Sequence, residues 1–437
     1  MAFNIDLENL EGLCRVPDNQ IDTRPDDEIA QELRQYCPTT DSEKNVWAYW
    51  HSGFDGMPPW VQRNVVNWVR RLGPSWTVRV VDSVDSSPMN VFRFVDAQFF
   101  PLSFRSATMT GTSRGAHSGD LVRLPLLQLY GGVWMDAGMI LIRHLDDIWN
   151  ILKDPSTPFE LAGMALQLRG PGDDDTMMNS FFAAPRGNEY ITRWHRIFLA
   201  TWADRTESKG IHAHPLLRHL KPFFPPPAEG RAPNIQSASA DMSDYLAHML
   251  CGERLMNLID SHDGFNGREY YENKIYLLPG LREYYYFELK NRWDAQRQFD
   301  LLSTPYDVDP EARDERFHAA RDMVDNMLRN TAMIKLSHRP RESPKPWLAD
   351  LWDDSKNHDA DNKPGTFAFY LRQNILRYNQ TRPLKTCTVG QLKERVWSAG
   401  VLEPIEDASG EVIAAIESQL APRGVPLAVV TVEAIAE

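Results

Sequence analysis

Cysteines and long apolar runs are scarce in this 437-residue chain. Its four cysteines form no CxxC pair, so we expect reduced thiols rather than a disulfide scaffold or a zinc site. No apolar run reaches the ~18–20 residues of a membrane-spanning helix, and the first residues lack the basic flank and apolar core of a signal peptide. The sequence therefore predicts a cytoplasmic protein without a membrane span.

An excess of positive charge is also absent. The chain has 47 Lys and Arg residues against 60 Asp and Glu residues, which gives a formal net charge of -13 at pH 7. Proteins whose main partner is nucleic acid or an anionic membrane carry a basic surface, so we expect neither partner. The hydrophobic fraction of 42% and the charged fraction of 24% are typical of a globular protein with a sizeable core.

Length and local composition divide the chain into three predicted parts. A chain of this length exceeds the ~250–300 residues at which a single core stops growing. Residues 1–43 are polar and are expected to form an N-terminal arm, with a short helix after Pro25. Residues 44–383 form the main domain with helical insertions, and residues 384–437 form a small α/β C-terminal extension.

Several shorter segments have predicted conformations of their own. Prolines make residues 222–236 a linker, and glycines with three acids make residues 169–178 a loop. Within the extension, apolar periodicity predicts helices over residues 390–397 and 411–420, and a strand over residues 426–432.

The first part of the main domain reads as a βαβ unit. Residues 45–50, NVWAYW, are aromatic and favour a strand, and residues 76–82, WTVRVVD, favour another. Between them, apolar residues recur with helical spacing over residues 61–72 until Gly73 and Pro74 end the pattern. Strand, helix and strand in about 35 residues predict parallel neighbours in one sheet.

A second unit brings a carboxylate to the end of a strand. Residues 117–130 have an apolar helical face, with a kink expected at Pro125, and residues 133–136, VWMD, form the following strand. Further along the chain, a helix is expected over residues 188–202 between strands over residues 181–185 and 274–280. We therefore predict an α/β fold with a Rossmann-type, mixed and mostly parallel sheet.

The carboxylate at the strand end is Asp136, and open α/β sheets bind their ligands at the carboxyl ends of strands. Asp120 and Arg123 lie three residues apart and hence on one face of the preceding helix. Taken singly, such a pair is most often a solvated surface pair, and a double glycine is most often a turn. Their clustering beside Asp136 instead favours a ligand site.

Residues 119–138, GDLVRLPLLQLYGGVWMDAG, resemble the SDxxR…LLxxYGGxWxD segment of capsular polysaccharide synthesis-type proteins and DXD-motif glycosyltransferases, a family that includes fungal and yeast Golgi mannosyltransferases. Weaker resemblance extends over residues 45–68, 179–194 and 333–338. The resemblance implies a GT-A-like fold and transfer of a sugar from a nucleotide sugar. We expect a UDP-linked donor and retention of the anomeric configuration.

The resemblance also implies roles for individual residues. Asp120 and Arg123 would hold the donor sugar, and the strand-end motif would bind ribose, diphosphate and metal, with Asp120 and Asp136 as the catalytic candidates. The candidate donor-binding residues are Trp47, Tyr49, Trp50, Arg123, Gly131, Gly132, Asp136, Ala137, Gly138, Lys335 and His338. For the tryptophans, core packing is the commoner role, and for His338 it is a plain surface position.

The motif departs from Asp-X-Asp because Gly138 stands where the second aspartate is expected. An ion of Mn²⁺ or Mg²⁺ would thus lose one oxygen ligand. Asp136 and His338 remain the metal candidates, and the acids at residues 173–175 are alternative ligands. Lys335 and His338 are the candidate cations for the departing diphosphate, because the resemblance implies that their segment returns to it.

The acceptor is not specified by any motif, and we expect a small hydrophobic metabolite or a polysaccharide precursor. An alternative is a catalytically degenerate protein that binds a nucleotide sugar or serves as a scaffold, which the missing second aspartate favours. A metal-dependent hydrolase built on Asp120 and Asp136 is weaker, because such sites usually show several clustered His and Asp ligands.

Overall fold

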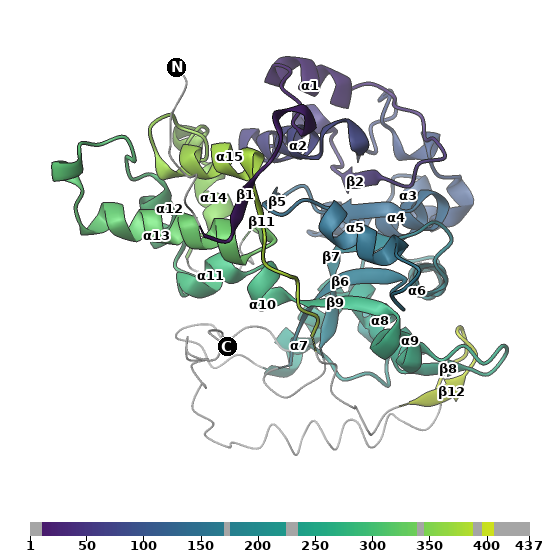
Figure 1. The fold of residues 1–437 in the computed structure, drawn as a ribbon. Helices are drawn as coiled ribbons and strands as arrows, with labels where there is room; N and C mark the ends of the chain where they lie inside the picture. The colour runs from purple at the N-terminus through teal and green to yellow at the C-terminus, as the bar shows by residue number, and fades with distance from the viewer. Residues whose placement is uncertain (1–10, 170–174, 224–234, 339–344, 388–395, 406–437) are drawn as a thin grey trace, which may run out of the picture.

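The computed structural model describes residues 11–169, 175–223, 235–338, 345–387 and 396–405 (Figure 1). Within these ranges a six-stranded sheet has the order β3-β2-β4-β7-β6-β9. Its strands are β2 (Asn45–Tyr49), β3 (Thr77–Val81), β4 (Gly132–Met135), β6 (Leu161–Leu166), β7 (Thr176–Ala184) and β9 (Ile275–Pro279).

The sheet is mixed and mostly parallel, as predicted. β7 runs antiparallel to both of its neighbours, β4 and β6, whereas the other adjacent strands are parallel. The predicted βαβ unit is confirmed, because α2 (Pro59–Leu72) joins β2 to its parallel neighbour β3. Gly73 ends this helix with a φ of 57°, a conformation that glycine adopts without strain.

Helices cover both faces of this sheet. Trp47 in β2 packs its ring against Tyr130 of α4 (Arg114–Tyr130), while its neighbours Val46 and Ala48 point to the opposite face and are equally buried. α4 also packs against α6 (Glu189–Trp202), which in turn contacts α8 (Ala247–Met256). The strands therefore form the centre of one continuous core.

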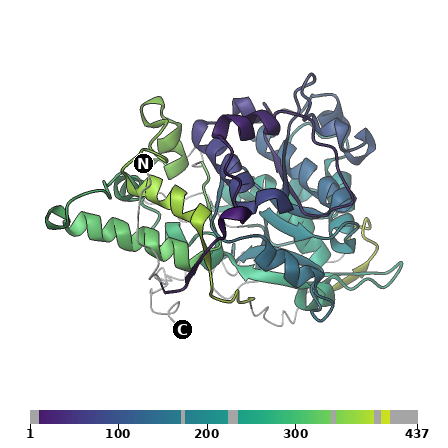
Figure 2. The same ribbon diagram turned by 45° about the horizontal axis from the view of Figure 1, so that its top comes forward.

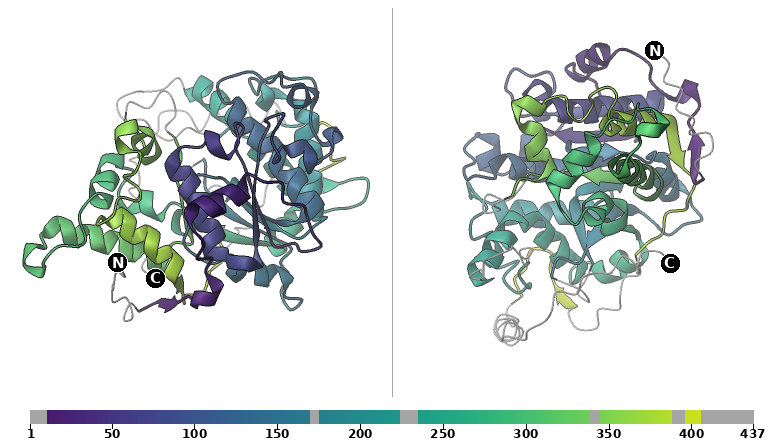
Figure 3. Two further views of the ribbon diagram at one scale, coloured as in Figure 1. Left: turned by 90° about the horizontal axis from the view of Figure 1, so that it is seen from above. Right: turned by 90° about the vertical axis from the view of Figure 1, so that its left-hand side faces the viewer.

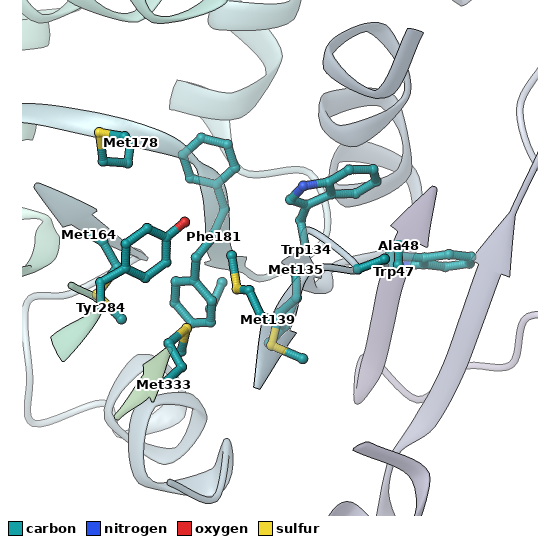
Figure 4. Close-up of a cluster of buried hydrophobic side chains, with 14 of the residues drawn as sticks. Trp47, Ala48, Trp134, Met135, Met139, Met164, Met178, Phe181, Tyr284 and Met333 are labelled. Atoms are coloured by element: carbon teal, nitrogen blue, oxygen red, sulfur yellow. The ribbon is translucent and has the colours of Figure 1, made fainter. Parts of the chain in front are cut away.

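The core reaches the carboxyl end of β4. Figure 4 shows side chains of β4 and β7 gathered with those of two short strands, β5 (Met139–Leu141) and β10 (Met333–Lys335). Met135, Met139, Phe181 and Met333 are all fully buried there. β5 and β10 pair antiparallel, which brings residues 333–335 back to the turn that follows β4.

A group of helices from the second half of the chain lies to one side of the sheet (Figures 1 and 2). α13 packs against α11, α12 and α15, and α15 contacts α2. Their bounds are α11 (Tyr286–Lys290), α12 (Ala295–Leu302), α13 (Glu315–Asn330), α14 (Leu348–Asp353) and α15 (Phe367–Arg377). The remaining helices are α1 (Asp26–Leu33), α3 (Leu102–Arg105), α5 (Asp146–Lys153), α7 (Ile235–Tyr245), α9 (Gly267–Asn273) and α10 (Gly280–Glu283).

Both ends of the described chain are joined to this body. β1 (Leu13–Arg15) pairs antiparallel with β11 (Tyr378–Gln380), and α1 begins after Pro25 as predicted and packs on α2 (Figure 3). β12 (Trp397–Ala399) pairs in parallel with β8 (Leu258–Asp260). Of the helices in the described residues, none combines the length and apolar character needed to cross a bilayer.

Three sequence-based boundaries were wrong. The predicted loop over residues 169–178 ends early, because Thr176, Met177 and Met178 already belong to β7. The predicted linker also ends early, because α7 begins at Ile235. Trp397, predicted as the end of a helix, lies in β12. The segments 411–420 and 426–432, for which a helix and a strand were predicted, lie outside the described residues.

Candidate active site

Asp136 lies directly after β4, at the carboxyl end that β2 and β3 share. Its Oδ1 accepts a hydrogen bond from the indole Nε1 of Trp134 at 3.0 Å, and its Oδ2 lies 3.1 Å from Nζ of Lys335. The Asp136 side chain keeps 32% of its surface exposed, so a ligand has access to it. The strand-end carboxylate thus exists as predicted, held between an indole and an ammonium group.

Asp120 and Arg123 form a buried ion pair beside it. Nη2 of Arg123 lies 2.8 Å from Oδ1 of Asp120 and 3.7 Å from Oδ1 of Asp136. The guanidinium also lies over the ring of Trp134, 5.0 Å from its centroid. Burial raises the pKa of Asp120 against the opposing effect of Arg123. The alternative interpretation, a solvated surface ion pair, is therefore wrong, since both side chains are at least nine-tenths buried.

Asn179 in β7 completes this arrangement and was not singled out from the sequence. Its Nδ2 donates to Oδ1 of Asp120 at 2.9 Å, and its backbone oxygen accepts a bond from Arg123. The only available signal was its position at the start of the segment 179–194, where family resemblance was noted. A spacing argument along one helix cannot find a partner on another strand.

Lys335 reaches the site because β10 pairs with β5. The Lys335 backbone N–H donates to the oxygen of Tyr284 at 3.1 Å, and its Nζ lies 5.8 Å from the centroid of the Tyr284 ring. Its side chain is 14% exposed, so the ammonium group is largely shielded from water. Lys335 is therefore a second cation at the Asp136 carboxylate, and it lies closer than Arg123.

The turn residues Ala137 and Gly138 are held by neighbouring elements. The Gly138 oxygen accepts a hydrogen bond from the Leu336 N–H at 3.2 Å. A Cβ placed on Gly138 would lie 2.7 Å from the backbone oxygen of Leu336. The position of the second aspartate is thus closed to any side chain unless β10 shifts.

The donor set does not fit a resident divalent ion. Both oxygens of Asp136 already have protein partners, and Gly138 has no room for a second carboxylate. No group of three His, Cys, Asp or Glu side chains within the described ranges lies close enough to hold an ion. Of the alternative acids at 173–175, the first two lie outside those ranges.

His338 is not paired with Asp136. Its Nε2 lies 2.7 Å from Oδ2 of Asp353 in α14, and its ring lies 6.4 Å from the ring of Trp60. The hydrogen bond to Asp353 raises the pKa of His338. Trp60 donates to the same carboxylate at 2.7 Å, so His338 belongs to a three-residue contact next to the turn.

Two of the aromatic candidates lie at the carboxyl end of β2. The Tyr49 hydroxyl lies 2.7 Å from the Ser83 hydroxyl, and Trp50 donates from its indole to the Gly56 oxygen at 3.1 Å. A Cβ on Gly119 would lie 3.5 Å from the Tyr49 ring, so α4 approaches this end closely. Tyr49 and Trp50 thus share the sheet edge with Asp136.

Trp47, Gly131 and Gly132 are three predicted donor-binding residues that the structure places in the core or at the other end of β4. Trp47 is fully buried and donates to the Gly131 oxygen at 3.1 Å, so it is a core residue. Gly131 and Gly132 have φ angles of 64° and 104° and precede β4. A strand of four residues spans roughly 13 Å. These glycines therefore lie at the opposite end of β4 from Asp136, where they permit a tight turn against Asn45.

Comparison with known proteins finds one matching family and several relatives. The family described as "Capsular polysaccharide synthesis protein" matches residues 11–211, which include Asp120, Arg123 and Asp136. The O-glycosyltransferase braB of Annulohypoxylon truncatum is 48% identical over 90% of this chain and 93% of its own length. The glycosyltransferase afumC of Aspergillus fumigatus is 42% identical over 87% and 96%, and the O-glycosyltransferase PaGT of Phomopsis amygdali is 39% identical over 90% and 96%.

One solved structure, the PaToxG glycosyltransferase, is similar with a TM-score of 0.28 and 11% identity over 80% of this chain and 92% of that chain. A score of this size supports no inference.

Relatives at this identity and coverage define the class: the chain belongs to the same family of glycosyltransferases. It is a glycosyltransferase, an enzyme that transfers a sugar to an acceptor.

Proposed function

We propose that this enzyme transfers a hexose from a UDP-sugar to a hydroxyl group of a small molecule or polysaccharide precursor, with retention at the anomeric carbon. The observation that carries the proposal is the Asp136 carboxylate between Lys335 and Arg123 at the carboxyl end of β4. Two relatives are named O-glycosyltransferases, which supports an oxygen as the acceptor atom.

Electrostatics support Lys335 as the residue that assists departure of the diphosphate. When the bond between the anomeric carbon and the diphosphate breaks, negative charge grows on the diphosphate and positive charge on the sugar. A shielded ammonium group next to the site stabilises the first charge more strongly than an exposed one would. Asp120, Arg123 and Asn179 would hold the sugar, since their buried geometry is already fixed.

Front-face displacement needs no dedicated base. The acceptor hydroxyl forms its new bond to the anomeric carbon on the side that the diphosphate leaves, and its proton passes to the departing diphosphate oxygen. This route agrees with a site that offers carboxylates already engaged with cations. Free thiols at Cys14, Cys37, Cys251 and Cys387 further favour action in the reducing cytoplasm.

A divalent ion enters this proposal only as a partner of the donor diphosphate. Because the Asp136 carboxylate is partly exposed but already paired with Lys335, Mn²⁺ or Mg²⁺ should bind weakly to the protein alone and more tightly with UDP present. Calorimetric titration of Mn²⁺ with and without UDP measures this difference. Tight binding to the protein alone that survives Asp136→Asn would contradict it and direct attention to the acids at 173–175.

The first test of the function is a thermal-shift panel of UDP-, GDP- and other nucleotide sugars, with and without Mn²⁺. A UDP-sugar should raise the Tm most, and the same compound should be hydrolysed slowly to free sugar without acceptor. Asp136→Asn should abolish hydrolysis in a folded protein. Stabilisation by a nucleotide sugar without any hydrolysis would instead favour the alternative of a degenerate binding protein.

A further inference from the structure

A buried polar chain leads from the C-terminal helices to the turn that carries Asp136. Asn64 in α2 is completely buried, and its Nδ2 donates to the Ala137 oxygen at 3.2 Å. Its Oδ1 accepts from Nη1 of Arg372 in α15 at 2.6 Å. Because Arg372 is a donor only, its contact fixes which end of the Asn64 amide faces the turn.

Arg372 is itself held by a carboxylate. Its Nη2 lies 2.7 Å from Oδ2 of Asp361, whose side chain has no exposed surface, and 3.3 Å from the Trp60 oxygen. Arg63 contacts the same carboxylate at 3.0 Å and 2.5 Å. Burial lowers the pKa of Arg372, and Asp361 opposes that effect. The polar contacts thus lead from Asp361 through Arg372 and Asn64 to the backbone oxygen of Ala137.

This contact is one of a set that fixes every carbonyl of the turn. The backbone oxygen of Asp136 accepts a hydrogen bond from the Met139 N–H at 3.1 Å, and the backbone oxygen of Gly138 accepts one from the Leu336 N–H at 3.2 Å. Of these three bonds, the one to the Ala137 oxygen is made by a side chain, that of Asn64. Arg372 orients this side chain, and Asp361 in turn holds Arg372. A turn held on three sides keeps its carboxylate in one place.

We infer that Asn64, oriented by Arg372 and Asp361, is a positioning residue that sets the place of the Asp136 carboxylate relative to Lys335 and Arg123. This inference rests on the proposed role of Asp136. A displacement of about 1 Å in a catalytic group can cost on the order of a hundredfold in rate without loss of the fold. The C-terminal helices would then be part of the catalytic unit, although no residue of α15 touches the Asp136 side chain.

The test is Asn64→Asp, which keeps the size of the side chain and the partner for Arg372 but turns an acceptor toward the Ala137 oxygen. Donor hydrolysis at saturating UDP-sugar should fall tenfold or more, with KM changed less than threefold. Asn257→Asp is the matched control, because that buried side chain makes a comparable bond to the Glu253 oxygen, far from the turn along the chain. It should lose a similar amount of Tm and keep the rate.

Arg372→Lys is a second variant, at a residue that contacts Asn64 and not the turn itself. A lysine cannot contact Asn64 and Asp361 together, so it should reproduce the loss in kcat. The double variant should be at most about twofold slower than either single variant, because both changes break the same series of polar contacts. Additive losses, or a folded Asn64→Asp with the wild-type rate, would overturn the inference.

Two further outcomes separate this inference from the proposed function. Asp136→Asn is assayed in parallel: if that variant stays active, the role of Asp136 fails, whereas a dead Asp136→Asn beside a fully active Asn64→Asp removes the positioning role alone. If neither Asn64→Asp nor Arg372→Lys folds, these polar contacts are needed for folding rather than for positioning Asp136, and the inference is also overturned.

Discussion

At the scale of single residues, the site depends on how many groups share one guanidinium. Arg123 contacts Asp120, approaches Asp136, bonds the Asn179 oxygen and lies over Trp134. A planar guanidinium can make these contacts together, whereas an ammonium group cannot. Arg123 therefore holds Asp120, Asn179 and Trp134 in one arrangement beside Asp136.

This geometry predicts a selective binding defect in Arg123→Lys. If Asp120 and Arg123 hold the donor sugar, affinity for the UDP-sugar should fall about tenfold or more, while affinity for UDP should change little. Calorimetry with both ligands measures the two affinities. Arg193→Lys, at another buried guanidinium that pairs with the buried Asp260, is the control and should leave both affinities unchanged. Equal losses for UDP and UDP-sugar would contradict the assignment.

Gly138 shows where sequence reasoning needed the structure. The missing second aspartate suggests that Gly138→Asp would restore a metal ligand, but the Leu336 oxygen stands 2.7 Å from any Cβ there. Even Gly138→Ala should destabilise the fold, by about 1–3 kcal/mol, because backbone must move. Gly115→Ala in α4 meets only the His51 ring at 3.4 Å and should be neutral or stabilising.

Denaturant unfolding of the two alanine variants measures this difference. A Gly138→Ala protein as stable as the wild type would show that the backbone at Leu336 can shift without loss of stability. A side chain with a second carboxylate could then be accommodated at position 138. Gly138→Asp would in that case tighten Mn²⁺ binding.

At the scale of elements, the sequence predicted what local spacing specifies. The βαβ unit, α4 and β4 follow from periodicity and turn residues, and the pair Asp120 and Arg123 follows from helical spacing. Contacts across elements were not predictable in this way: Asn179 and Asn64 reach the site from β7 and α2 only because of sheet order and helix packing. Gly131 and Gly132 are close to Asp136 in sequence, but the whole of β4 separates them from it in space.

A buried arginine of the main body has most of its hydrogen-bond partners in the predicted C-terminal extension. Arg254 in α8 is fully buried, and its guanidinium donates to the oxygens of Gly400, Val401 and Glu403, as well as to that of Leu216. β12 pairs with β8 beside it. Removal of residues 384–437 would therefore strand a buried charge as well as uncover apolar surface.

We predict that a chain ending at Pro383 has a markedly lower Tm but keeps its affinity for UDP, because no contact of Asp136 comes from the removed part that the structure describes. Arg254→Leu should raise the Tm of the truncated chain and lower that of the full chain, since the charge lacks its partners only in the first. The same sign in both backgrounds would contradict this account. Loss of UDP binding in a folded truncation would mean that the donor site extends into the removed residues.

At the scale of the whole molecule, buried neutral histidines should limit stability in acid. His219 and His248 are fully buried, and no ring nitrogen of either has a hydrogen-bond partner in the described part of the chain. Burial lowers the pKa of His219 to about 3 and that of His248 well below its ordinary value. His219 packs against Trp397 of β12, with 4.6 Å between ring centroids.

The sign of the effect follows from proton uptake. Below pH 6.5 the unfolded chain binds a proton at each of these histidines and the folded chain does not, so stability falls as the pH falls. For His219 the loss at pH 5 amounts to about 2 kcal/mol. His219→Leu removes this site and should therefore narrow the gap in unfolding free energy between pH 7.5 and pH 5. His318→Leu, the same change at an exposed position of α13, should keep the full gap, and urea unfolding at both pH values measures each variant. An unchanged gap in a folded His219→Leu would mean that protonation of His219 is not excluded by the fold, and that the contact between β12 and the main body opens to water in the native state.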